Sequence, residues 1–254
     1  MNQTEKARAF AGLHIPGNPI ILFNAWDAGS AKAVADAGAK AIATGSWSVA
    51  AAQGFTDAEA LPMEFAIANA ARIAAAVELP VTLDFEGGYA IEPGTLAANF
   101  GRVLSAGVIG CNFEDQRIGG EGLHPVRDQA RRVEALRREA ERAGIPAFIN
   151  ARTDIFLKAK PEAHDNAAVD HALERARAYA DAGASGFFVP GLADERLLAR
   201  VCEGSPLPVN AMMFAGMPDK KRLAELGVAR ISHGPGPYRQ AMAALTEMAR
   251  AAFA

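Results

Sequence analysis

The chain has 254 residues, half of them apolar, and its formal net charge is −3, with 26 Lys plus Arg against 29 Asp plus Glu. This near balance gives no indication of a nucleic-acid partner, and the length suits one α/β barrel domain. Only two cysteines occur, without metal-ligand spacing, which argues against a disulfide framework and for a reducing compartment.

The N-terminal residues lack the apolar core of a signal peptide. Charged residues also interrupt every apolar stretch before it reaches the roughly 20 residues that would span a bilayer. We therefore expect a cytoplasmic protein without a membrane partner.

In chain order, the first 15 residues predict a helix, and strands and helices then alternate. Each predicted strand is a short apolar run rich in β-branched or aromatic residues, and each is followed by a segment with helical periodicity. The predicted strands are 19–27, 41–47, 80–86, 108–115, 146–154, 185–191, 206–213 and 228–234. Eight such units favour a closed (β/α)8 barrel, formed as a single domain by residues 1–254. The alternative is a flavodoxin-like or Rossmann sheet, although no G-x-G-x-x-G motif follows a strand.

Polar residues gather where the predicted strands end, which is where the active sites of α/β barrels lie. The polar strand-end residues are Asn24, Asp27, Thr44, Ser46, Asp84, Glu86, Asn112, Glu114, Asp115, Asn150, Arg152, Asp154, Asn210, Ser232 and His233. Several of them have simpler interpretations: Asp27 and Asp115 suit helix caps or salt bridges, and Asp154 either orients Arg152 or contacts a ligand. The sixth strand ends in Pro190 and Gly191 and offers no polar side chain.

Three of these carboxylates predict a metal site. Asp84 and Glu86 are two residues apart and so point to the same face of their strand, and Glu114 ends the next strand. Clustered acids repel unless a cation neutralises them, and oxygen ligands without His or Cys suit Mg2+ or Mn2+. A divalent ion beside Arg152 would make a receptor for a small anionic substrate.

Six segments resemble the isocitrate lyase/phosphoenolpyruvate mutase superfamily over nearly the whole length of the chain. They are NAWDAGSA (24–31), TGSWSVAAAQGFTD (44–57), DFEGGY (84–89), FEDQ (113–116), NARTD (150–154) and Val209-Asn210. Members use a (β/α)8 barrel and Mg2+ to make or break C–C or P–C bonds in small 2-oxo or 2-hydroxy acids.

The resemblance implies a role for each matching position. Asp84 would bind Mg2+, with Glu86 and Glu114 acting directly or through bridging waters, and Asp57 would lie near the metal and substrate. The substrate-binding residues would be Thr44, Gly45, Ser46, Trp47, Arg152 and Asn210, with Arg152 also catalytic. The resemblance further implies a homodimer or homotetramer in which the last helix, 238–253, packs on a partner subunit.

The segment after the fourth strand departs from the family pattern. The lyases carry a cysteine acid/base in this loop, but here it reads QRIGGEGLHP (116–125). Glu121 and His124 are the remaining catalytic candidates in it. Its glycines suit a gating loop over 116–128 that closes on the substrate, and the alternative is an ordinary flexible surface loop.

Three functions remain open from the sequence. The first is a Mg2+-dependent carbon–carbon lyase acting through an enolate, similar to an oxaloacetate decarboxylase. The second is P–C chemistry, as in a phosphonopyruvate mutase or hydrolase. The third is a barrel that binds a 2-oxo acid without catalysis. In each case the expected ligand is a small anionic 2-oxo acid or phosphonate.

Overall fold

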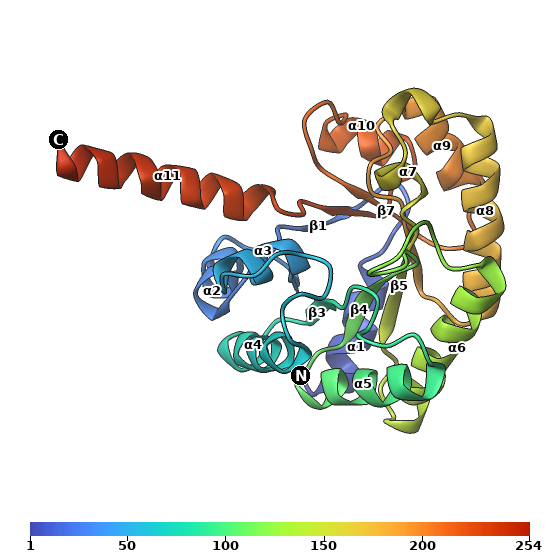
Figure 1. Cartoon of the computed structure of the whole chain (residues 1–254), viewed down its shortest axis with the longest axis horizontal. Helices are drawn as coiled ribbons and strands as arrows, with labels where there is room; N and C mark the ends of the chain where they lie inside the picture. Colours follow the sequence, from blue (N-terminus) through green and yellow to red (C-terminus); the bar gives the residue numbers. More distant parts are fainter.

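The computed structural model describes residues 1–254 and contains eight parallel strands in a nearly closed barrel (Figure 1). The strands are β1 (Ile20–Leu22), β2 (Ile42–Ala43), β3 (Val81–Asp84), β4 (Gly110–Glu114), β5 (Phe148–Arg152), β6 (Gly186–Phe188), β7 (Val209–Met212) and β8 (Arg230–Ser232). They are paired in the order β1-β8-β7-β6-β5-β4-β3-β2. Between β1 and β2 the only pairing is a single parallel bridge, Ala25 to Thr44. The predicted (β/α)8 barrel is confirmed.

Each observed strand lies inside its predicted range but is shorter. Some of the polar residues expected at strand ends therefore occupy turns and helix starts just beyond the strands, whereas Asp84, Glu114 and Arg152 are the last residues of β3, β4 and β5. Ser46, for example, is the first residue of a helix, and Glu86 lies in a turn two residues past β3. For Ser46 and Glu86, the backbone beyond the strand sets the direction of the side chain.

Eleven α-helices and one short 3-10 helix accompany the strands. They are α1 (Gln3–Gly12), α2 (Ala28–Asp36), α3 (Ser46–Ala52), α4 (Met63–Ala76), α5 (Pro93–Ser105), α6 (Val126–Arg142), α7 (Ile155–Lys158), η1 (Pro161–Ala163), α8 (Asn166–Asp181), α9 (Glu195–Gly204), α10 (Lys220–Glu225) and α11 (Gly236–Phe253). The N-terminal helix and the eight helices that follow the strands were predicted. Helices α3 and α7 were not, and both lie at the carboxyl ends of strands. None of the helices is long and apolar enough to cross a membrane.

Short polar side chains start several of the helices. Asp27 caps α2 and accepts a hydrogen bond from the Ser30 amide at 2.7 Å, as the simpler interpretation of Asp27 predicted. Asp165, Asp194 and Asp219 cap α8, α9 and α10 in the same way. These caps fix where each helix leaves its loop, and so they position the loops that surround the site.

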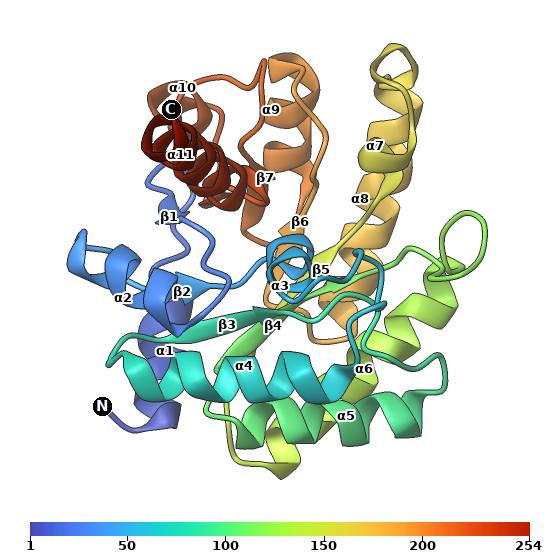
Figure 2. The same cartoon turned by 60° about the vertical axis from the view of Figure 1, so that its left-hand side comes forward.

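The largest part of the core lies between the strands and the surrounding helices. Its 33 buried residues include Phe100 of α5, Leu136 of α6 and Tyr179 of α8. Helices α4 and α5 run side by side along the outside of β3 (Figure 2). Helix α1 packs at the amino ends of the strands, where Phe10 and His14 contact Phe148 with ring centroids 5.4 and 3.9 Å apart. The opposite, carboxyl end of the barrel stays open to the loops.

Helix α11 extends away from the barrel (Figure 1). Pro237 is the only buried residue in it, whereas Leu245, Met248 and Phe253 are 57%, 71% and 88% exposed. The exchange of this helix between subunits stays a prediction.

Candidate active site

A cavity of about 200 Å³ lies at the carboxyl ends of the strands. It is smaller than the roughly 300–1,000 Å³ of pockets for drug-sized ligands, which suits a small acid. Its lining residues are Asn24, Gly45, Ser46, Trp47, Asp57, Asp84, Asn112, Arg152, Leu157, Phe188, Pro190, Met212, Ser232, Gly234 and Pro235. Six of the residues selected from the sequence therefore meet here: Gly45, Ser46, Trp47, Asp57, Asp84 and Arg152.

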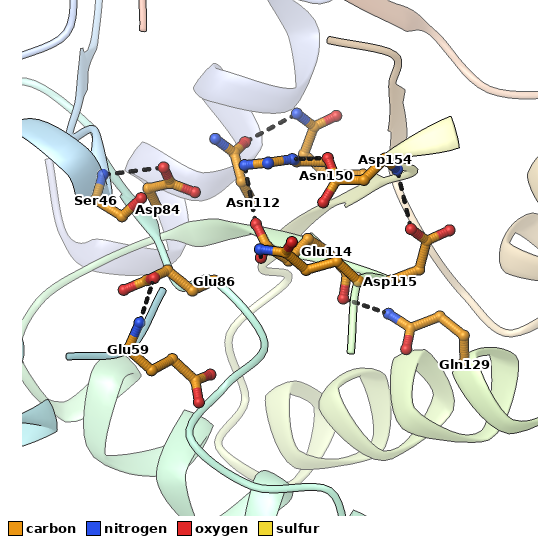
Figure 3. A network of polar contacts seen from close by, with 12 residues as sticks. Ser46, Glu59, Asp84, Glu86, Asn112, Glu114, Asp115, Gln129, Asn150 and Asp154 are labelled. Atoms are coloured by element: carbon orange, nitrogen blue, oxygen red, sulfur yellow. Dashed lines mark hydrogen bonds and ion pairs between the residues drawn. The ribbon is translucent and has the colours of Figure 1, made fainter. Parts of the chain in front are cut away.

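Asp84 is held in place from one side and free on the other. Its Oδ2 accepts a hydrogen bond from the Ser46 amide at 3.0 Å (Figure 3). Its own amide donates to Thr44 Oγ1 at 2.9 Å. Its Oδ1 is buried and has no hydrogen-bond partner in the chain. A buried carboxylate oxygen without a partner is costly, so this atom indicates a missing ligand such as a cation. Thr44 thus does not line the cavity, but its hydroxyl helps to orient Asp84, which does.

Asp57 lies beside Asp84 on the segment between α3 and α4. Asp57 is an exposed residue overall, but the protein atoms around its carboxyl group and the charge of Asp84 raise the pKa of Asp57, although a hydrogen bond from the Ser46 side chain opposes them. The next two residues, Ala58 and Glu59, have φ of +67° and +58°, which is rare for residues other than glycine. Strain of this kind clusters at functional sites, which is consistent with the predicted catalytic role of Asp57.

Glu86 is turned away from Asp84. With φ of +51°, it directs its side chain toward the segment that follows Asp57. Its Oε2 accepts a hydrogen bond from the Glu59 amide at 2.7 Å (Figure 3). Its Oε1 accepts one from the Tyr89 hydroxyl at 3.3 Å. Burial and the nearby charges of Asp57 and Asp84 raise its pKa to about 8, against the opposing hydrogen bond from Glu59.

Arg152 holds two buried carboxylates at once. Its Nη1 lies 2.9 Å from Glu114 Oε2, and its Nε donates to Asp154 Oδ1 at 2.6 Å. Burial raises the pKa of Glu114 even though Arg152 opposes that shift, and Glu114 and Asp154 together raise the pKa of Arg152 against its own burial. Asp154 therefore orients Arg152, one of the two roles foreseen for it.

Asp115 is structural, as its simpler interpretation predicted. It forms a buried salt bridge with Arg175 at 3.0 Å. It also accepts a hydrogen bond from the Asp154 amide at 2.9 Å (Figure 3). Its contacts support the strand ends without reaching the cavity.

Asn210 lies one layer below the cavity and does not line it. Its Oδ1 accepts from Asn150 at 3.0 Å, and its Nδ2 donates to backbone carbonyls of Ala211 and Arg230. The residue that reaches the cavity from the same strand is Met212, two positions later and on the same face. The predicted contact of Asn210 with substrate has no counterpart in this arrangement.

The loop candidates also lie outside the cavity. Glu121 is exposed, between Gly120 and Gly122. His124 is buried, with its amide donating to the Asp115 carbonyl at 2.8 Å. It lines a separate groove of about 970 Å³ together with Arg117 and Arg132. The gating role of 116–128 remains a prediction, and only movement of this loop would bring Glu121 or His124 over the cavity.

The apolar part of the cavity was missed by the sequence reasoning. Leu157 follows β5 on α7, Phe188 ends β6, and Met212 ends β7. Apolar residues at strand ends look like core in a sequence, so their pattern carried no signal. The polar lining residues did carry a signal, because a polar side chain at the end of a buried strand is unusual; they are Asn24, Asn112 and Ser232.

The acidic residues provide the oxygen donors that a divalent cation requires, but only part of the geometry. All the donors are carboxylate oxygens, and Asp84 Oδ1 is free and buried. However, no three His, Cys, Asp or Glu side chains converge on a common point that could hold a metal ion. Glu86 and Glu114 are instead satisfied by hydrogen-bond donors of the chain itself. Asp84 is thus the one predicted ligand that is ready for an ion.

This chain is similar in sequence to several known proteins and in fold to solved structures. A crystal structure from Burkholderia cenocepacia J2315, provisionally assigned as a phosphonomutase, is 50% identical, with a TM-score of 0.97 over 99% of this chain and 100% of that one. An uncharacterised protein of Mycobacterium tuberculosis (strain ATCC 25618 / H37Rv) is 35% identical over 96% of this chain and 88% of its own length. The oxaloacetate decarboxylase of Pseudomonas syringae pv. tomato is 29% identical over 72% of this chain and 62% of its own.

The family model for phosphoenolpyruvate phosphomutase matches residues 10–253, which include every strand of the barrel and the cavity at its carboxyl end. The chain therefore belongs to the phosphoenolpyruvate phosphomutase family, within the superfamily expected from the sequence.

Proposed function

We propose that this protein is a Mg2+-dependent lyase that breaks a carbon–carbon bond at C3 of a small 2-oxo acid, leaving a pyruvate-type enolate. The observation that carries the proposal is the buried, unpartnered Oδ1 of Asp84, a residue that lines the cavity of about 200 Å³ together with Arg152. An ion and a guanidinium side by side suit the adjacent carboxylate and keto oxygens of a 2-oxo acid.

Asp84 would hold the ion, and Glu86 and Glu114 would support it through water. When bound, Mg2+ would polarise the keto group and stabilise negative charge on its oxygen. Its positive charge would also offset the crowding of Asp57, Asp84 and Glu86, whose proximity helps to raise the pKa of Asp57 and Glu86.

Arg152 would bind the carboxylate of the substrate. Its Nε and Nη1 are engaged by Asp154 and Glu114, which fix the plane of the guanidinium. Its Nη2 has no hydrogen bond within the chain and is the donor left for a ligand. Because the guanidinium is held from two sides, little side-chain entropy is lost when a carboxylate binds.

Asp57 is the residue best placed to hold a proton near the reacting carbon. Because its pKa is raised, Asp57 keeps its proton up to a higher pH than an ordinary aspartate does. Cleavage leaves a carbanion-like C3 that must be protonated, and Asp57 lines the cavity where C3 would lie.

The comparisons support carbon–carbon cleavage without deciding it. The relative from Pseudomonas syringae is an oxaloacetate decarboxylase, which breaks such a bond. The provisional assignment of the 50% identical structure favours a second candidate, P–C chemistry on a phosphonate. The position of Glu121 and His124 outside the cavity favours a third, a binder without catalysis.

Deuterium exchange at C3 of pyruvate tests the lyase directly, because it detects enolate formation without knowledge of the leaving group. In D2O with Mg2+, we expect NMR to show exchange that chelator abolishes. Asp84→Asn should abolish it too, whereas Asp36→Asn, the same change at an exposed position of α2, should not.

Product analysis with oxaloacetate and phosphonopyruvate then separates the first two candidates. Release of CO2 and pyruvate would indicate C–C cleavage, and release of phosphate or formation of phosphoenolpyruvate would indicate P–C chemistry. Oxalate binding without exchange or turnover would leave only the binder. An Asp84→Asn protein that binds oxalate with Mg2+ as the parent does would contradict the assigned site.

A further inference from the structure

Arg230 carries a positive charge below the cavity and has no acid to pair with it. It lies on β8, two residues before the cavity-lining Ser232 and on the same face of the strand, and it is fully buried. It takes part in no salt bridge, and its Nε and Nη1 have no hydrogen-bond partner in the chain. Burial lowers the pKa of Arg230 to about 9, although the charge of Asp84 opposes the shift. An unpaired buried guanidinium is costly, so packing alone does not account for this residue.

The hydrogen bond of Arg230 fixes the orientation of the Asn112 side chain. Arg230 Nη2 donates to Asn112 Oδ1 at 2.9 Å. Asn150 Nδ2 donates to the same oxygen, also at 2.9 Å (Figure 3). A guanidinium can only donate, so the amide oxygen of Asn112 must face Arg230 and the amide cannot be turned over.

The other end of this amide is a donor that is free to bind a ligand. Asn112 lines the cavity, and its Nδ2 makes no hydrogen bond within the chain. Asn112 is the register partner of Asp84 on the neighbouring strand, and Figure 3 shows its amide nitrogen on the side of Asp84. An amide nitrogen does not bind Mg2+, and the Asn112 oxygen already accepts from two donors. Asn112 is therefore suited to bind an anionic oxygen and unsuited to bind the ion.

The second asparagine of the cavity lining, Asn24, has no such free group. Its Nδ2 donates to the Thr44 carbonyl at 2.8 Å. Its Oδ1 accepts from the amides of His233 and Gly234, both at 2.9 Å. Of the two asparagines, Asn112 alone can offer an N–H2 group to a ligand.

We infer that Asn112 Nδ2 binds the C2 oxygen of the 2-oxo acid, and that Arg230 is the positioning residue that holds this donor in place. This inference rests on the proposed function, which puts the ion at Asp84 and the substrate carboxylate at Arg152. The C2 oxygen then lies on the side of Asp84, where the Asn112 amide points. Negative charge develops on this oxygen as the enolate forms, and a donor that is fixed beforehand, with a positive charge beneath it, stabilises that charge without reorganisation.

Asn112→Leu tests the donor, because it removes the amide at nearly the same side-chain size. Binding of Mn2+ alone, followed by EPR, should stay at the parent value, because Asn112 is not a ligand of the ion. Oxalate binding at saturating Mg2+, measured by calorimetry, should weaken about tenfold or more, because a hydrogen bond to a charged group is lost. Parental affinity for oxalate in folded Asn112→Leu would overturn the inference. Asn166→Leu, the same change at an exposed position of α8, is the matched control and should bind oxalate as the parent does.

Asn112→Asp separates binding from folding. It keeps the side-chain shape, leaves an oxygen for both donors and gives Arg230 a carboxylate partner, so its melting temperature should not fall below that of the parent. Oxalate affinity should nevertheless drop at least as far as in Asn112→Leu, because an acceptor replaces the donor. A loss confined to Asn112→Asp would show repulsion by the new charge rather than a lost donor, and the inference would be wrong.

Arg230→Met tests the positioning role. Methionine fills a similar volume, and the guanidinium it replaces has no ion pair, so the variant should melt no lower than the parent. Oxalate should bind about tenfold more weakly, whereas Mn2+ should bind at least as tightly, because a positive charge near Asp84 has been removed. Arg230→Lys keeps the charge and should recover part of the oxalate affinity. A lower melting temperature with parental oxalate affinity in Arg230→Met would show a purely structural role and overturn this part of the inference.

The parent protein distinguishes the two possible failures. If the parent does not bind oxalate with Mg2+, the proposed function itself fails. If the parent binds oxalate, Asp84→Asn does not, and both Asn112 variants bind like the parent, only the inference about Asn112 and Arg230 fails.

Discussion

The two sides of the barrel rim differ in how their residues are held. On the side of β1 to β5, polar groups are fixed by other polar groups, as when Ser46 holds Asp84 and Glu114 holds Arg152. On the side of β6 and β7, the side chains that line the cavity are the apolar Phe188 and Met212, and the ring of Phe188 lies beneath the Arg152 guanidinium, 6.0 Å from ring centroid to guanidinium carbon. The first arrangement orients charge toward one part of a ligand, and the second selects the shape and polarity of the remainder. The predictions below test whether these two tasks are separate.

Arg152→Met should produce the largest effect, on the polar side. The change leaves Glu114 and Asp154 buried without their counter-charge, which typically destabilises a protein by about 3–5 kcal/mol. Urea unfolding at neutral pH measures the loss. Arg102→Met is the matched control, since Arg102 pairs with Glu64 on the surface, at 46% and 69% side-chain exposure, where solvent screens the pair and its loss should change stability little. Similar losses in both variants would contradict the structural role of Arg152.

Phe188→Leu should have a smaller effect, on the apolar side. Phe188 is 3% exposed, and the smaller side chain should leave a void that lowers the free energy of unfolding by about 1–2 kcal/mol. The Mg2+-dependent affinity for oxalate should stay unchanged, because oxalate needs only the polar side. A large loss of oxalate affinity in the folded variant would show that the two sides are not separate.

A smaller, pH-dependent effect should come from Glu86. Its pKa rises from 4.5 to about 8 in the fold, mainly by burial, so the folded protein holds a proton there that the unfolded chain releases. Stability from this group is therefore present at low pH and falls as pH rises from about 4.5 to about 8. In chelator, the melting temperature should drop between pH 6 and pH 8, and Mg2+ should reduce the drop.

Glu86→Gln should make this pH dependence shallower, because the amide does not titrate. Glu121→Gln, at an exposed position of the loop, serves as the control. A pH dependence that is unchanged in Glu86→Gln would show that the carboxylates of the polar side do not control stability in this range.

The polar side could be read from the sequence and the apolar side could not. Asp84 and Arg152 stand out because a charged residue at the end of a buried strand needs a reason. Leu157 and Phe188 do not stand out in the sequence, because apolar residues at such positions are expected as part of the core. The barrel itself was predictable because a short apolar run followed by a segment with helical periodicity repeats eight times.

Details within one strand were harder to predict. Asn210 and Met212 share a face of β7, but only the outer one reaches the cavity, and register decides which. Glu86 was expected to face the metal with Asp84. Its left-handed backbone instead turns it toward Glu59, a consequence of the turn geometry that strand periodicity does not contain. The conformation of the loop at 116–128 was equally hard to predict, since its sequence does not determine whether it lies open or closed over the cavity.

Calorimetric titration of the protein with oxalate, with and without Mg2+, tests the central claim most directly. Oxalate carries the two adjacent carboxyl groups that mimic the enolate of a pyruvate-type acid, and it requires nothing of the loop or the apolar wall. We predict binding that depends on Mg2+ and is lost in Asp84→Asn. Binding of equal strength in chelator, or in Asp84→Asn, would contradict a metal-assisted site at the carboxyl end of this barrel.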